Sequence, residues 1–331
     1  MGTPRGMDLK APLKKFDNLQ QRHNAIGFPL AVMKKFGDDQ AGNLAALIAY
    51  YAFFSIFPLL LVLVTVLGIV LHNDPSLQHR ILNSALTDFP VIGDQLKKNV
   101  GSLNRTGAGL IIGLVGTFWG ARGVATAAQN AFNAIWEVPF KDRPGFPKNQ
   151  LRSVAMIGVV GVGVLVTTGL SAIGGGTGSV GVALRVGAIA LSFVLNALLF
   201  WLGFRLATAS VVKTRELLLG AILAAIVWQV LQGIGSYLVA HELKNSSGVY
   251  GVFGLVLGLL SWLYLQAQFT IYAVEIDIVR QRKLWPRSLL APPLTEADER
   301  AYEAYADVEM RRHPQDVDLD VNEPIRQDGD A

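Results

Sequence analysis

The side chains that most often carry out chemistry are scattered along this sequence. The 331 residues include five histidines and no cysteine. The missing cysteines exclude disulfides, thiolate zinc sites, iron–sulfur clusters and cysteine nucleophiles. Phosphodiester cleavage usually needs clustered carboxylates or histidines that hold metal ions, and the histidines form no such cluster. We therefore predict no catalytic residue, no cofactor and no enzymatic activity. The histidines are His23, His72, His79, His241 and His313.

Two weaker patterns point to ligand binding and have simpler explanations. His72, Asp74 and His79 share one loop, and another loop begins at His241. These loops could meet as a metal site, but solvated loop histidines are the favoured interpretation, and we predict no metal. Residues 176–181 fit the spacing G-x-G-x-x-G. A dinucleotide fingerprint needs a preceding strand and a distal acid, so a flexible turn is favoured here.

A proline inside a long apolar stretch is the more informative feature. Pro58 lies near the middle of residues 41–71, a span that also contains Asn43, Ser55 and Thr65. Proline removes one backbone hydrogen bond and kinks a helix. Kinked helices line substrate sites in transporters, and the alternative is a plain kink satisfied by a neighbouring helix.

A few charged and amide side chains also lie within or beside apolar stretches. Charges inside a membrane span are costly and tend to pair or to face water. Arg122 and Glu275 are both expected near the cytoplasmic ends of their spans, where they could form a structural clasp or line a vestibule. Arg205 fits an interfacial anchor. Asn133 fits either an inter-helix hydrogen bond or the lining of a polar cavity.

The elements that position these residues are six long apolar segments. Hydrophobic residues make up 51% and charged residues 16% of the chain, whereas soluble domains contain about 25% charged residues. About 20 apolar residues cross a bilayer as a helix, the form that satisfies every backbone group within the segment. We predict an all-α polytopic membrane bundle of six transmembrane helices plus interfacial amphipathic helices. The predicted spans are 41–71, 107–128, 153–173, 184–204, 217–240 and 252–274.

Three regions follow from the charge distribution. Residues 1–40 are basic and carry an apolar stripe, which predicts a cytoplasmic helix on the membrane surface or a solvated amphipathic helix. Residues 41–280 form the membrane domain, in which residues 72–106 are expected to form two short amphipathic helices. Residues 281–331 are expected to be a cytoplasmic, acidic, disordered tail, with 12 acidic against 4 basic residues after position 291. No cleavable signal peptide is expected.

Lysine and arginine predict the orientation. With the N-terminus inside, the inner segments hold 18 Lys and Arg residues and the outer loops hold five. Such a bias places both termini in the cytoplasm and the chain in the cell membrane. The basic charge is therefore attributed to topology and not to nucleic-acid binding. The expected partners are membrane lipids, and a homo-oligomer is left open.

A series of short motifs, taken in order, resembles the YihY / virulence factor BrkB family of bacterial inner-membrane proteins. The resemblance covers about residues 40–280 and implies a multi-pass protein without an agreed biochemical activity. Where the family usually has Gly-Ala-Glu in the last span, this chain has Ala273-Val274-Glu275 preceded by Tyr272. The motifs are Ala45-Ala46, Tyr50-Tyr51, Ser55-Ile56-Phe57-Pro58-Leu59, Trp119-Gly120-Ala121, Ala131-Phe132-Asn133-Ala134-Ile135-Trp136, Arg205, Gly220, Trp228, Tyr250-Gly251, Trp262-Leu263-Tyr264 and Glu275.

Three function hypotheses follow. The first is a transporter or exporter of an envelope-related, lipid-like or anionic solute, with a site near Pro58 and with Arg122 and Glu275 on the cytoplasmic side. The second is a non-transporting membrane scaffold or envelope-integrity factor. The third is a membrane-associated ribonuclease, an older label of the family, which the missing catalytic cluster disfavours.

Overall fold

The chain folds into a bundle of long helices. The computed structural model describes residues 10–70, 108–174, 182–241, 251–290 and 293–311, and these contain helices and no strand, which confirms the all-α prediction. Five helices among the described residues are long and apolar enough to cross a membrane. The count of six spans stays a prediction. The long helices are α3 (Ala41–Val70), α6 (Ala108–Ile135), α7 (Lys148–Gly174), α8 (Val182–Ala207), α9 (Leu218–His241) and α10 (Gly251–Gln281).

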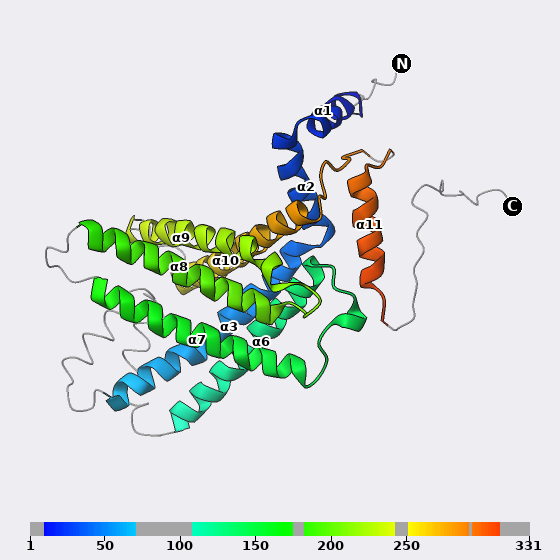
Figure 1. The fold of residues 1–331 in the computed structure, drawn as a ribbon. Helices are drawn as coiled ribbons and strands as arrows, with labels where there is room; N and C mark the ends of the chain where they lie inside the picture. The colour runs from blue at the N-terminus through cyan, green and yellow to red at the C-terminus, as the bar shows by residue number, and fades with distance from the viewer. Residues whose placement is uncertain (1–9, 71–107, 175–181, 242–250, 291–292, 312–331) are drawn as a thin grey trace, which may run out of the picture.

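The long helices pack in a closed succession. Helix α3 packs on α6, α6 on α7, α7 on α8, α8 on α9, α9 on α10, and α10 returns to α3. The short helices α1 (Lys10–Arg22), α2 (Asn24–Asp38) and α11 (Glu296–Val308) gather at one end of this bundle (Figure 1). We call this the charged end. The 3-10 helices η1 (Phe140–Asp142) and η2 (Thr214–Leu217) lie in the connections after α6 and α8.

Burial is concentrated toward the charged end. The fully buried residues cluster in the last turns of α6, α8 and α10 and in the first turns of α3 and α9, together with α2 and α11. Within the apolar windows of the candidate spans, only 11–33% of residues are buried inside the protein. Large exposed apolar side chains such as Ile111, Ile112 and Val162 are normal there, because lipid covers such surfaces in a membrane bundle.

The acidic tail is partly structured, contrary to the disorder expected after residue 281. Thr295 is the N-cap of α11 and forms a capping box with Asp298. Acidic residues in a first turn are stabilised by the helix dipole, so the acidic composition marks the start of a helix. Ala297 and Ala301 are buried, and residues 312–331 lie outside the described residues. Residues 72–106 and 176–181 also lie outside them.

Candidate functional site

A buried ammonium group at the charged end is surrounded by three carboxylates. The Nζ atom of Lys35 lies 2.5 Å from Asp39 Oδ2 and 2.9 Å from Glu137 Oε1. The same Nζ lies 3.5 Å from Glu275 Oε2 and donates a hydrogen bond to the carbonyl of Ile135 at 3.0 Å. Each of the four charged side chains is at most 3% exposed. We call Lys35, Asp39, Glu137 and Glu275 the lysine cluster.

Helix α2 supplies two members of the cluster from its C-terminal turn. Lys35 and Asp39 are four residues apart, so their side chains meet on one helix face. A cation near a helix C-terminus is stabilised by the helix dipole. Asp39 is the C-cap residue, and Ala41 then starts α3. This short turn holds the two charges directly against the ends of α6 and α10.

Glu137 enters the cluster through an unusual helix end. The N–H of Val138 donates to the carbonyl of Asn133, and the N–H of Glu137 donates to that of Ala134. This is a Schellman motif, in which glycine is usual at the left-handed position. Here that position is Glu137, with φ of 51°. A side chain in this conformation costs about 1–2 kcal/mol, which the contacts of the carboxylate must offset.

Lys35 attracts the three carboxylates, whereas the carboxylates repel one another. Burial lowers the pKa of Lys35, but Glu275, Glu137 and Asp39 raise it more, and the net pKa lies above its usual range. The ammonium is therefore protonated at every physiological pH. Burial raises the pKa of Asp39, and Lys35 opposes this only in part, so the net shift is upward. Asp39 thus holds a proton more readily than an exposed aspartate does.

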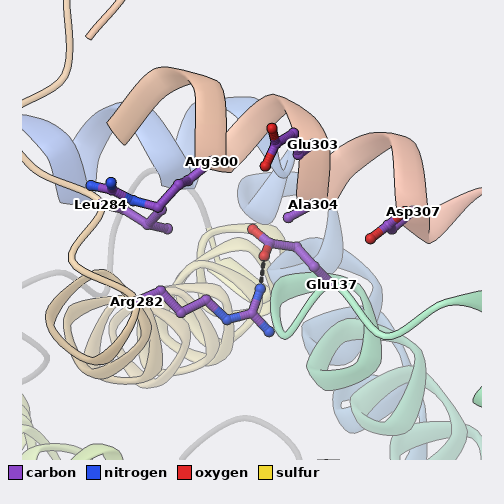
Figure 2. A pocket seen from close by; sticks show the side chains of 7 residues that line it. All are labelled: Glu137, Arg282, Leu284, Arg300, Glu303, Ala304 and Asp307. Carbon is purple, nitrogen blue, oxygen red and sulfur yellow. Dashed lines mark hydrogen bonds and ion pairs between the residues drawn. The ribbon is translucent and has the colours of Figure 1, made fainter. Parts of the chain in front are cut away.

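A pocket gives solvent access to one edge of the cluster. Arg282 forms an ion pair with Glu137 and donates to the carbonyl of Trp136 at 2.7 Å. Figure 2 shows this pair at the base of the pocket, with α11 on the other side. The pocket has a volume of about 300 Å³. The side chain of Arg282 is 35% exposed, so water reaches the ion pair. The lining residues are Glu137, Arg282, Leu284, Arg300, Glu303, Ala304 and Asp307.

A second polar cluster fastens α11 to α2. Asp298 lies 2.8 Å from Lys34 Nζ and 2.9 Å from Arg287 Nε, and it accepts the N–H of Ser288 at 2.8 Å. Burial raises the pKa of Asp298, but the hydrogen bonds from these groups lower it more, to about 2. Arg287 also pairs with Asp38 at 2.9 Å. We call Lys34, Asp38, Arg287, Ser288 and Asp298 the Asp298 clasp.

Pro58 and Ser55 contact a glycine face of α6. A Cβ atom on Gly116 would lie 2.9 Å from the Cβ of Pro58, and one on Gly120 would lie 2.7 Å from that of Ser55. The hydroxyl of Ser55 donates to the carbonyl of Ala52 at 2.8 Å. Gly116 and Gly120 belong to the small-residue pattern that lets helices approach closely in lipid. The neighbourhood of Pro58 therefore favours helix packing over a polar substrate site.

Asn133 and Arg205 both stabilise the end of α8. The side-chain oxygen of Asn133 accepts the N–H of Ala209 at 2.8 Å. Arg205 donates to the carbonyls of Ala209 and Val212 at 3.4 and 3.3 Å. These bonds hold the connection after α8, and the side chain of Asn133 also donates to the carbonyl of Ala207 at 3.4 Å, a group that the end of the helix leaves without an intrahelical partner.

The clasp that the sequence suggested between Arg122 and Glu275 is wrong. Glu275 pairs with Lys35 of α2, and Arg122 forms no ion pair within the described part of the chain. The sequence could not rank these partners, because it does not show that α2 folds back onto the end of α10. Asn43 is exposed and donates to the side chain of Gln40 at 3.2 Å.

Several charged residues of the site were missed by the sequence analysis. Lys35 and Asp39 were assigned to a surface helix, although they are buried at the centre of the cluster. The role of Glu137 could have been predicted, because it is the single acidic residue between Arg122 and Asp142. An isolated acid beside an apolar segment is expected to have a buried partner.

The described residues contain no group of three histidine, cysteine, aspartate or glutamate side chains that could hold a metal ion. The lysine cluster brings three carboxylates together, but Lys35 occupies its centre. The chemistry available at this site is therefore proton exchange and ion pairing. Most of the histidine loops considered from the sequence lie outside the described residues.

The fold and the buried charges define a multi-pass α-helical membrane protein. The model of the virulence factor BrkB family matches residues 32–295, and the chain belongs to this family. The family resemblance predicted from the motifs is thereby confirmed. The matched region includes the whole lysine cluster.

Curated relatives carry membrane-protein names. The chain is 26% identical to the inner membrane protein YhjD of Escherichia coli over 289 residues, which cover 81% of this chain and 85% of that protein. It is 25% identical to a UPF0761 membrane protein of Alcanivorax borkumensis, with coverage of 79% and 62%. No solved structure matches. The chain is thus a multi-pass inner-membrane protein, and these names describe no enzymatic activity.

Proposed function

We propose that this protein transports or exports an envelope-related solute, anionic or lipid-like, and that the lysine cluster couples this movement to protons. The observation that supports the proposal is a surplus of buried negative charge. Three carboxylates face Lys35, and Arg282 pairs with one of them through Glu137. With every group ionised, one negative charge is left without a counterpart. A surplus carboxylate in such a place takes up a proton.

Glu275 is the best candidate for the proton-binding group. Its side chain is fully buried beside Lys35 and Asp39. It lies in α10, which is apolar and long enough to span the membrane. Ionisable groups in such helices often mark proton or ion pathways. Protonation of Glu275 would weaken its attraction to Lys35 and loosen the contact between α2 and α10.

A specific observation also supports the scaffold alternative. The Asp298 clasp and the glycine face of α6 hold their elements closely together, and Pro58 packs against Gly116 of α6. A scaffold needs no water inside the bundle and no proton exchange at Glu275. The two functions therefore differ in whether water reaches buried faces of α10.

Cysteine labelling distinguishes the two functions, since the chain has no cysteine of its own. Single cysteines at buried Ala267 and Ile271 would be compared with one at Phe269, which is 40% exposed on the apolar surface. Transport predicts that a membrane-impermeant maleimide labels Ala267→Cys and Ile271→Cys but not Phe269→Cys. A scaffold predicts that none is labelled, and that result would contradict transport.

A second experiment tests the role of Glu275. In proteoliposomes with a pH-sensitive dye inside and candidate anionic envelope solutes outside, solute-dependent proton movement is expected for the wild type. Glu275→Gln should abolish it while keeping the shape of the side chain. Glu216→Gln, on the 3-10 helix η2 and outside the lysine cluster, is the matched control. Equal proton movement in both variants would contradict proton coupling through Glu275.

A further inference from the structure

Two arginines lie close together at the charged end of α7 and α8, and no acidic side chain of the described residues pairs with them. Arg152 donates to the carbonyl of Thr208 at 3.0 Å, and Arg205 donates to the carbonyls of Ala209 and Val212. Among the described residues neither forms an ion pair. Burial lowers the pKa of Arg152, and the positive charge of Arg205 lowers it further. The pair is therefore a site of unbalanced positive charge.

An apolar groove begins one helical turn from these arginines. It has a volume of about 500 Å³ and is lined by aliphatic side chains and glycines of α7 and α8. Ala155 and Leu202, the lining residues nearest the charged end, are three residues from Arg152 and Arg205. Side chains three apart share a helix face, so each arginine continues one wall of the groove.

The groove and the arginine at its end together have about the length of one membrane leaflet. From Arg152 to Gly163, α7 rises roughly 16 Å at 1.5 Å per residue. One leaflet contributes about 15 Å of hydrocarbon, half of the bilayer core. The wall residues Val162 and Leu198 are 62% and 45% exposed, so the groove is open at the surface. Its shape fits an extended acyl chain that enters from the leaflet at the charged end.

We propose that this groove binds an anionic glycerophospholipid, with one acyl chain between α7 and α8 and its phosphate between Arg152 and Arg205. A guanidinium group has five N–H donors and binds phosphate in a bidentate manner. Each arginine uses only part of this capacity on backbone carbonyls. The site is distinct from the lysine cluster and does not depend on transport.

Glycines of α7 provide a matched pair of variants for the acyl-chain site. Gly158 lines the groove, and a Cβ atom there would meet nothing within 4 Å. Gly158→Leu should therefore fill the groove without a clash at Cβ. Gly161 is also open at the Cβ position but is not among the groove residues. Gly161→Leu adds the same side chain to the same helix outside the site.

Native mass spectrometry of the detergent-purified protein tests the site. The probes are phosphatidylglycerol, phosphatidylcholine with the same acyl chains, and inorganic phosphate. We expect phosphatidylglycerol to bind at least tenfold more tightly than either of the others. Arg152→Gln and Arg205→Gln should each weaken its binding about fivefold, and Gly158→Leu should abolish it. Lys148→Gln, at an exposed position one turn earlier on α7, and Gly161→Leu should change little.

Three results would overturn the proposal. These are equal binding of the two lipids, binding of free phosphate as tight as that of phosphatidylglycerol, and full binding by Gly158→Leu. Size-exclusion elution and thermal unfolding of each variant identify folded protein. If Arg152→Gln does not fold, Arg152→Lys keeps the charge and loses the bidentate geometry. It is expected to bind more weakly than the wild type, and unchanged binding would also count against the site.

Discussion

The two ends of the helix bundle are held together by different forces. At the charged end, buried ion pairs join α2, α6, α10 and α11, and the side chains of these pairs are at most 3% exposed. Along the apolar lengths, α3 and α6 meet through glycines that contact Ser55 and Pro58. Lipid offers no hydrophobic force between helices, so close packing of small residues takes its place. At the charged end, the electrostatic attraction within each ion pair must instead exceed the large free-energy cost of removing both charges from water.

This difference predicts that the charged end is sensitive to the removal of single charges. Lys35→Met leaves three buried carboxylates without their shared cation. Removing one partner of a buried pair typically costs about 3–5 kcal/mol, so this variant should show the largest loss of stability. Chemical denaturation in detergent measures the effect. Lys15→Met, at an exposed position on α1, is the control, and equal stability of both variants would contradict the importance of the cluster.

In the apolar region, stability should depend on the volume of the side chains between helices and not on their charge. A Cβ atom on Gly120 would lie 2.9 Å from the backbone Cα of Ser55, so Gly120→Ala must push α3 and α6 apart. Overpacking of this kind costs about 1–3 kcal/mol. In Gly258→Ala the new Cβ atom meets nothing within 4 Å, and the higher helix propensity of alanine should leave stability unchanged or raise it. Thermal unfolding compares the two, and similar losses would contradict the close-packing argument.

The Asp298 clasp should weaken in acid. The pKa of Asp298 falls from an ordinary 3.8 to about 2 in the folded protein. A lowered pKa adds stability that is complete above pH about 4 and is lost as the pH falls toward 2. The full effect is on the order of 2 kcal/mol. Limited proteolysis of α11 between pH 5 and 2.5 should show this loss in the wild type. In Asp298→Asn, α11 should be cleaved faster than in the wild type at pH 5, and the cleavage rate should depend less on pH. If the cleavage rates of the two proteins changed with pH in parallel, Asp298 would not be the group that titrates.

The smallest expected effect concerns the start of α11. The hydroxyl of Thr295 accepts the N–H of Asp298 at 3.2 Å and donates to the carbonyl of Pro286 at 2.9 Å. Thr295→Ala removes this cap, which is typically worth about 1 kcal/mol. Hydrogen exchange in the first turn of α11 should become faster. Glu303→Gln, later in the same helix, provides the comparison, and equal acceleration in both would argue against a specific capping role.

The sequence by itself determined the membrane character and the approximate positions of the long helices. Residues 41–71 and 252–274 were expected as spans; α3 begins at the same residue as the first and contains its residues 41–70, and α10 contains all of the second. Such spans can be recognised from the sequence because they depend on local properties, namely the length of the apolar segment and the hydrogen bonding of its backbone within one helix. The capping box at Thr295 was equally local, but the acidic composition around it favoured the wrong prediction of disorder.

Only the tertiary structure decided which charges meet. Lys35 and Glu275 lie near opposite ends of the chain, and no spacing rule connects them. Their contact exists because α2 turns back onto the ends of α6 and α10, a choice that depends on packing between distant segments. The same holds for Arg152 and Arg205, whose shared position follows from the antiparallel contact of α7 and α8. Local patterns fix helices, whereas the pairing of buried charges depends on how those helices assemble.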